Sequence, residues 1–183
     1  MRIIAGEWRG RKLAAPKGEA TRPTADRTRE TLFNMLASRI GPFEGLRVAD
    51  LFAGSGALGF EALSRGAQSC LFVEQDQAAL AAIRANETAF ASRGRCEVRS
   101  GSVMALGAAR QSVDLLLLDP PYGTGAAGVA LDRLLRLGWI GSGTWVAAET
   151  GADEALAVKG LAAEAERKVG KARLTLLRVA ASA

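Results

Sequence analysis

No histidine occurs among the 183 residues, and the chain has only two cysteines, Cys70 and Cys96. Catalytic triads and general bases built on histidine are therefore excluded, and too few soft ligands remain for an ordinary zinc site. No apolar stretch approaches the roughly 20 residues of a membrane span, and the first residues do not resemble a signal peptide. We expect one cytoplasmic domain with no metal and no membrane contact.

Net charge is absent from most of the chain. Residues 1–40 carry nine Lys/Arg against four Asp/Glu, and this excess of +5 equals the net charge of the whole protein. A basic segment on a neutral body indicates a polyanion partner such as nucleic acid, although basic runs are often only solubilising.

The order of apolar segments predicts an α/β fold. Residues 1–13 predict a small basic hairpin, residues 14–23 a loop, and residues 24–39 a helix capped by Thr24 or Asp26. From residue 46 strands alternate with helices, which is typical of a doubly wound, mainly parallel sheet. The expected strands are 46–52, 69–74, 97–99, 113–119, 144–149 and the pair 165–169 and 172–179; the expected helices are 57–65, 77–91, 103–110 and 128–137. We divide the chain into a hairpin and loop extension, 1–23, and a catalytic domain, 24–183.

The strongest functional signal is four leucines followed by Asp119, Pro120, Pro121 and Tyr122. Neither proline has an N–H to continue a ladder or a helix, so Asp119 and Tyr122 should project from the carboxyl end of a strand, where open α/β sheets bind ligands. A carboxylate and proline carbonyls beside an aromatic ring suit a planar group that carries an exocyclic NH2. A proline-stiffened turn without function is the plain alternative, and the sequence context favours the amine site.

A glycine-rich turn, residues 50–59, follows the first expected strand. Glycines let a ligand approach the backbone at a helix amino terminus, and Glu74, at the end of the next strand, is placed to accept hydrogen bonds from ribose hydroxyls. The same spacing fits a dinucleotide fingerprint, which keeps NAD open. Asp50 favours S-adenosylmethionine instead, because a carboxylate suits an ammonium group and repels a pyrophosphate.

The candidate binding residues form two sets. The expected cofactor-binding residues surround the glycine turn and the ends of the next strands: Asp50, Phe52, Ala53, Gly54, Ser55, Gly56, Glu74, Gln75, Gly101 and Ser102. The expected nucleic-acid contacts are basic residues of the amino end: Arg9, Arg11, Lys12, Arg22, Arg27 and Arg29. We expect the helix over 24–39 to display the last two.

The sequence resembles the RsmD family of bacterial 16S rRNA (guanine-N2)-methyltransferases. The segments that carry the resemblance are residues 2–13, 22–24, 27–34, 50–59, 61–65 and 119–122. The resemblance implies a seven-stranded Rossmann-like sheet with an antiparallel last strand and an N-terminal β-hairpin for RNA. It further implies S-adenosylmethionine as cofactor, 16S rRNA in the small ribosomal subunit or its assembly intermediate as partner, and a target guanine held by residues 119–122. Where many methyltransferases place Asp or Asn against the adenine, this chain has Ser100, Gly101 and Ser102, so backbone or a serine hydroxyl is expected there.

Three other readings stay open. A DNA adenine-N6 methyltransferase would use the same amine site, although 183 residues leave little room for a separate DNA-recognition domain. A nicotinamide-dependent oxidoreductase would use the same glycine turn, and a non-catalytic RNA-binding protein would use the basic amino end.

Overall fold

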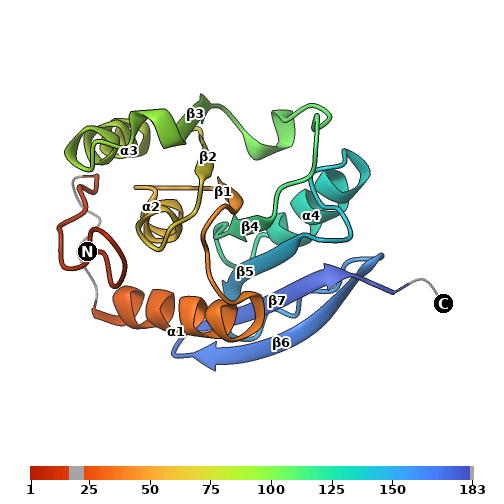
Figure 1. Cartoon of the computed structure of the whole chain (residues 1–183). Helices are drawn as coiled ribbons and strands as arrows, with labels where there is room; N and C mark the ends of the chain where they lie inside the picture. Colours follow the sequence, from red (N-terminus) through yellow and green to blue (C-terminus); the bar gives the residue numbers. More distant parts are fainter. Residues whose placement is uncertain (17–22, 182–183) are drawn as a thin grey trace.

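The computed structural model describes residues 1–16 and 23–181 (Figure 1). The described residues form four α-helices and two 3-10 turns besides the strands: α1 Pro23–Ile40, which precedes the first strand, α2 Ala57–Ser64, α3 Gln77–Ala89, η1 Arg93–Arg95, η2 Val103–Ala105 and α4 Ala126–Arg136. The strands are β1 Arg47–Leu51, β2 Ser69–Glu74, β3 Cys96–Ser100, β4 Leu115–Leu118, β5 Trp145–Gly151, β6 Leu161–Val169 and β7 Ala172–Val179. None of the helices in these described ranges has the length and apolarity needed to span a bilayer.

The strands form one seven-stranded sheet in the order β3-β2-β1-β4-β5-β7-β6. β1 lies between β2 and β4, and the pairs from β3 to β5 are all parallel. β7 runs antiparallel to both of its neighbours. The predicted doubly wound sheet with an antiparallel last strand is confirmed.

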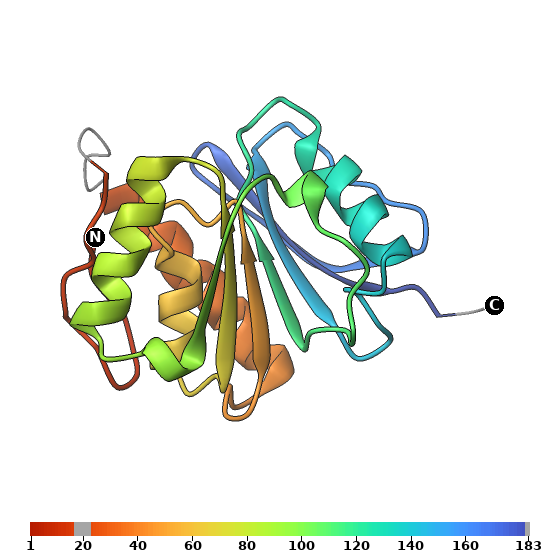
Figure 2. The same cartoon turned by 90° about the horizontal axis from the view of Figure 1, so that it is seen from above.

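Helices cover both faces of the sheet, with α1, α2 and α3 on one side and α4 on the other (Figure 2). The alternation along β4 shows how the core divides. Leu115 and Leu117 pack into the cluster that contains α1, α2 and α3, whereas Leu116 and Leu118 pack into the cluster that contains α4. All four leucines are fully buried, as expected for a parallel strand covered on both faces.

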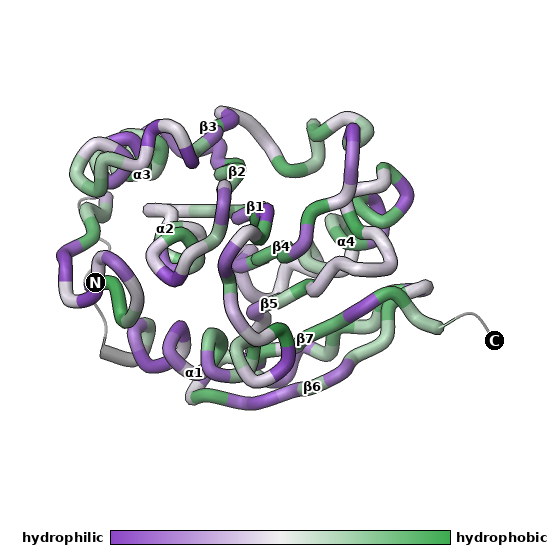
Figure 3. The backbone as a smooth tube through the Cα atoms, in the orientation of Figure 1, coloured by the Kyte–Doolittle hydropathy of each residue, from purple (hydrophilic) through white to green (hydrophobic). Residues whose placement is uncertain are grey.

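The edge strand β6 shows a different pattern, with hydrophilic stretches along its length (Figure 3). All nine of its residues are exposed or half-buried. Charged side chains on an edge strand prevent pairing with other chains. They also weaken the apolar alternation, which explains why the sequence predicts only 165–169 of a strand that begins at Leu161.

Residues 1–13, here called the N-terminal segment, fold back on themselves. Arg2 and Lys12 form an isolated antiparallel bridge, so the predicted hairpin is present as a bridged loop without regular strands. Ile3, Trp8 and Leu13 are buried in the same core as α2. The Trp8 ring stacks on Phe90 with ring centroids 4.8 Å apart. The segment is therefore packed into the core of the catalytic body, and the predicted domain division at residue 23 stays a prediction.

Gly6 allows the N-terminal segment to approach the end of α2. Its φ is +84°, and a Cβ atom there would lie 1.8 Å from the Ser64 carbonyl oxygen. The neighbouring Glu7 N–H donates to that same oxygen at 2.7 Å. No side chain fits between the two backbones, so glycine is required at this contact.

Two helix predictions differ from the structure. α1 begins at Pro23, where a proline suits the first helical position, and Asp26 pairs with Arg29 inside the first turn instead of capping the helix. The helix predicted over 103–110 is only the η2 turn. Tertiary hydrogen bonds hold the chain extended after η2: the Ala109 N–H donates to the Leu137 carbonyl, and the Trp139 Nε1–H donates to the Gly107 carbonyl.

Candidate active site

The predicted cofactor and target-base residues meet in one pocket of about 660 Å³ at the carboxyl ends of β1, β2 and β4. Every candidate cofactor residue except Gly56 lines it, and so do Asp119, Pro120, Pro121 and Tyr122. Both sets therefore share a single cavity, as expected for the carboxyl edge of a doubly wound sheet.

Strand alternation explains why acids from different strands face the same pocket. Asp50 follows Val48 by two positions, Glu74 follows Phe72, and Glu149 follows Ala147. Val48, Phe72 and Ala147 all pack into the cluster beneath α1, α2 and α3. Residues two apart on a strand point to the same face, so the three carboxylates continue that face into the pocket.

The glycine turn is shaped by close packing. A Cβ at Gly59 would lie 2.3 Å from the Phe72 ring, so glycine lets α2 sit directly on β2. A Cβ at Gly56, whose φ is +78°, would meet the Phe60 ring at 2.8 Å, so glycine is required there as well. Phe52 lines the pocket with a left-handed φ of +57°, a conformation that costs energy for a residue with a side chain and occurs preferentially at functional sites.

Glu74 is held rigidly by backbone donors. Its Oε2 accepts from the Gly54 N–H at 2.8 Å, and its Oε1 accepts from the Gln75 N–H at 2.7 Å and the Asp76 N–H at 2.9 Å. A carboxylate has about four acceptor sites, so one remains for a ligand. Glu74 thus fixes the glycine turn and presents a charge to the pocket.

Asp50 is almost completely buried and accepts from the Gly59 N–H at 2.8 Å. Burial raises the pKa of its carboxyl well above the usual range, the Gly59 hydrogen bond lowers it, and the nearby charges of Asp119 and Glu74 raise it further. Four acidic residues line the pocket: Asp50, Glu74, Asp119 and Glu149. No Lys or Arg is among its lining residues in the described part of the chain. The pocket is electrostatically suited to a cation.

The loop after β4 is fixed by contacts to β5 and to the turn beyond it. The Tyr122 hydroxyl donates to Glu149 Oε1, and the Gly123 N–H donates to Glu154 Oε2 at 2.9 Å. Tyr122 is still 45% exposed and lines the pocket, so part of it is accessible to a ligand. Backbone donation from Gly123 and Gly151 lowers the pKa of Glu154 and keeps it charged.

Sequence reasoning missed several pocket residues: Met1, Ala25, Ala57, Leu58, Val73, Val103 and Glu149. Most are apolar and carry no sequence signal for a site. Glu149 did carry one, because it is an acid at the end of an expected strand. Its place beside Asp119 depends on β5 being the neighbour of β4, and that order becomes visible only in the folded sheet.

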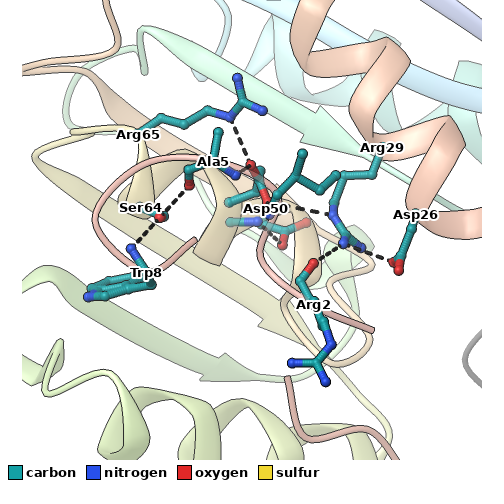
Figure 4. A network of polar contacts seen from close by, with 11 residues as sticks. Arg2, Ala5, Trp8, Asp26, Arg29, Asp50, Ser64 and Arg65 are labelled. Carbon is teal, nitrogen blue, oxygen red and sulfur yellow. Dashed lines mark hydrogen bonds and ion pairs between the residues drawn. The ribbon is translucent and has the colours of Figure 1, made fainter. Parts of the chain in front are cut away.

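A buried polar network joins the N-terminal segment to α2 (Figure 4). Glu61, fully buried on α2, accepts from the Ile4 N–H at 2.8 Å, the Ala5 N–H at 3.0 Å and Arg65 Nε at 2.9 Å. Ser64 Oγ donates to the Ala5 carbonyl at 2.6 Å and accepts from the Trp8 N–H at 2.9 Å. These bonds satisfy the irregular backbone of the segment and hold it against the helix that follows the glycine turn.

The predicted basic contacts divide into exposed and buried residues. Arg9, Arg11, Lys12 and Arg27 are exposed, whereas Arg22 lies outside the described residues. The expectation that α1 displays Arg29 is wrong: only 4% of its side chain is exposed. Its guanidinium pairs with Asp26 at 3.0 Å, lies 3.8 Å from Glu61, and donates to the Arg2 carbonyl. Arg29 therefore stabilises the N-terminal segment and is not available to RNA.

The sheet order, the single antiparallel strand and the acid-lined pocket define a Rossmann-like methyltransferase fold. The solved structure of the Escherichia coli protein yhhF, described as a candidate methyltransferase, superposes with a TM-score of 0.84 at 31% identity, over 100% of this chain and 99% of that one.

The chain belongs to the RsmD family: the family model described as Conserved hypothetical protein 95 matches residues 1–178. Ribosomal RNA small subunit methyltransferase D of Haemophilus influenzae is 40% identical over 160 residues, which cover 85% of this chain and 81% of the relative. YlbH of Bacillus subtilis, described as a candidate rRNA methyltransferase, is 44% identical over 127 residues, 67% of each chain.

Proposed function

We propose that this protein transfers a methyl group from S-adenosylmethionine to the exocyclic N2 amine of a guanine in 16S rRNA. The observation that carries the proposal is the single acid-lined pocket that joins the glycine turn to Asp119 and Tyr122. The relatives named as small subunit rRNA methyltransferases support the choice of RNA and of ribosomal subunit. We place the reaction in the cytoplasm, on the small subunit or its assembly intermediate.

S-adenosylmethionine supplies an activated methyl group on a sulfonium centre, and its charge fits the pocket. The ligand carries a sulfonium and an ammonium, and four carboxylates line the cavity. Asp50 would face the ammonium and Glu74 the ribose hydroxyls. Gly101 and Ser102 also line the pocket and would face the adenine. Ser102 Oγ accepts from the Met104 N–H at 3.2 Å, which leaves its own O–H to donate.

The residues at the end of β4 prepare the amine. The N2 lone pair of guanine is delocalised into the ring and is a poor nucleophile. Asp119 and the Pro120 carbonyl would accept from the two N–H bonds, localise the lone pair and aim it at the methyl group. Tyr122 would stack on the extruded base and offset part of the few kcal/mol of unstacking. Catalysis by positioning and charge needs no covalent intermediate.

Glu74→Ala should weaken S-adenosylhomocysteine binding by about 1.5 to 3 kcal/mol, since the charge-assisted hydrogen bond from its remaining acceptor site to the ribose is lost, together with the bond that holds the Gly54 turn. Calorimetric titration would measure this directly. Glu74→Gln is the matched control, because it retains one acceptor oxygen without the charge. Its affinity for S-adenosylhomocysteine should lie between those of the parent protein and Glu74→Ala. An affinity equal to that of the parent protein would remove Glu74 from the site.

Arg9→Ala with Lys12→Ala should weaken RNA binding and reduce its salt dependence by up to about 2 units of charge, because both side chains are exposed. Arg11 is left intact because its guanidinium lies 4.8 Å from the centroid of the Phe90 ring and donates to the Ala89 carbonyl. Binding would be measured by filter retention at several salt concentrations.

The matched control for this pair is Lys159→Ala with Arg167→Ala, which removes the same charge from exposed positions in and beside β6. The control should keep the parental salt slope. If both double variants lost RNA affinity and salt dependence to the same extent, overall charge, and not the N-terminal segment, would govern RNA binding.

The proposed function is tested by transfer of labelled methyl from S-adenosylmethionine to rRNA and to small ribosomal subunits, followed by nucleoside analysis. We expect N2-methylguanosine. N6-methyladenine would assign the amine site to another base, and cofactor binding without transfer to any substrate would indicate a non-catalytic RNA-binding protein.

A further inference from the structure

Glu149 is a second carboxylate beside the amine site. In the parallel pairing of β4 with β5, Leu118 lies opposite Ala148, so Asp119 and Glu149 occupy the next positions on adjacent strands. Both side chains line the pocket. Tyr122, the expected stacking residue, donates its hydroxyl hydrogen to Glu149. Glu149 therefore contacts the target-base side of the pocket without a role in the proposed methyl transfer.

The ring nitrogen next to the reactive amine distinguishes guanine from the other bases. In adenine and cytosine the nitrogen beside the exocyclic amine carries a lone pair and accepts a hydrogen bond. In guanine the nitrogen N1 beside N2 carries a hydrogen and donates. An enzyme that reads an extruded base does so through hydrogen bonds to this edge. A carboxylate next to the amine site would attract guanine and repel both alternatives.

We propose that Glu149 accepts the N1–H of the target base and thereby selects guanine among the bases that carry an exocyclic amine. This inference rests on the proposed function and adds the residue that determines the base. The Tyr122 hydroxyl bonds Oε1 of Glu149, and Oε2 is the oxygen assigned to N1–H. One residue then orients the stacking ring and reads the edge of the base.

The acceptor role requires an ionised Glu149. Burial raises the pKa of this carboxyl, and the hydrogen bond from Tyr122 lowers it. Burial is the larger of the two effects, so the pKa of Glu149 lies above its ordinary value, and the Tyr122 contact offsets part of that rise.

The test compares guanine with 2,6-diaminopurine at the target position of a synthetic RNA reconstituted into small subunits. Both bases carry an N2 amine, but the N1 of 2,6-diaminopurine is an acceptor. The wild-type protein should methylate guanine with a kcat/KM about 10- to 100-fold higher. Equal rates on the two bases would overturn the inference without any variant.

Two variants separate direct reading from an effect through Tyr122. Glu149→Gln retains an oxygen for the Tyr122 hydroxyl and places an NH2 toward N1, so it should lower the preference for guanine over 2,6-diaminopurine about tenfold or more. Tyr122→Phe keeps the ring and removes the hydroxyl that favours ionised Glu149, and it should lower that preference less than Glu149→Gln does, even if both rates fall. If Glu149→Gln lowered both rates equally, Glu149 would act only by positioning Tyr122, and the inference would be wrong.

Failure of the proposed function would look different. A wild-type protein that methylates neither base, or that methylates adenine in the same assay, would refute guanine-N2 methylation itself and the role of Glu149 with it. Methylation of guanine with no discrimination against 2,6-diaminopurine would refute only the role of Glu149.

Discussion

Replacing Asp119 by alanine is expected to lower the methylation rate at least about a hundredfold while cofactor affinity stays nearly unchanged, the scale found when a positioning and charge-stabilising group is lost. Asp119 follows β4 directly and lines the pocket, on the side that we propose for the target base. The groups assigned to the cofactor, Asp50 and Glu74, come from other strands. Loss of Asp119 should therefore affect turnover far more than S-adenosylhomocysteine binding.

The matched control is Asp114→Ala, because Asp114 is the acid at the opposite end of the same apolar run. It pairs with Arg47 at 3.4 Å and accepts from the Arg47 N–H at 2.8 Å, at the amino end of β1. Single-turnover rates with saturating cofactor would compare the two variants. Comparable turnover in Asp119→Ala and the parent protein would end the assignment of Asp119.

Glu61→Ala should lower the free energy of unfolding by about 3 to 5 kcal/mol, because removal of one member of a buried ion pair leaves its partners unpaired. Arg29 would remain buried beside Asp26 alone, and the Ile4 and Ala5 N–H groups would lose their acceptor. The loss is a large part of the stability of an ordinary domain. Urea denaturation followed by tryptophan fluorescence would measure it, since Trp8 is buried in the same region.

Glu97→Ala is the control for this experiment. Glu97 also pairs with an arginine, at 2.8 Å from Arg99, but both side chains are largely exposed. An exposed pair contributes at most about 1 kcal/mol, so this variant should be nearly as stable as the parent. A Glu61→Ala protein with the stability of the Glu97→Ala protein would show that the buried network contributes little.

The sequence predicted the sheet well because its central strands are buried on both faces. The expected strand over 69–74 coincides with β2, and the four leucines of β4 stand out as an apolar run. A chain segment that cannot face water must be apolar throughout, and that property is visible without coordinates. The 3-10 turn at Val103 was not visible, since its end depends on partners more than 25 residues away in the sequence.

Site residues that belong to a sequence motif were predictable. Residues whose role depends on whether the side chain is exposed were not. The turn after β1 and the residues after β4 form the predicted pocket. Arg29 contributes to the positive charge of the amino end, yet its burial removes it from the surface. A count of charges cannot distinguish an exposed arginine from a buried one. Predicting that Glu149 lies beside Asp119 requires the register between β4 and β5, and the sequence of neither strand alone contains that information.

The contact between Gly6 and Ser64 has a consequence for how this protein can diverge. Residues 3–8 are held by backbone geometry and buried partners, whereas Arg9, Arg11 and Lys12 lie in the exposed part of the same loop. A change at Gly6 would unseat the loop, but exchanges at residues 9 and 12 leave its anchorage intact. Within these thirteen residues, the positions that anchor the segment are separate from the exposed positions, so the exposed side chains can change while the packing against α2 is kept.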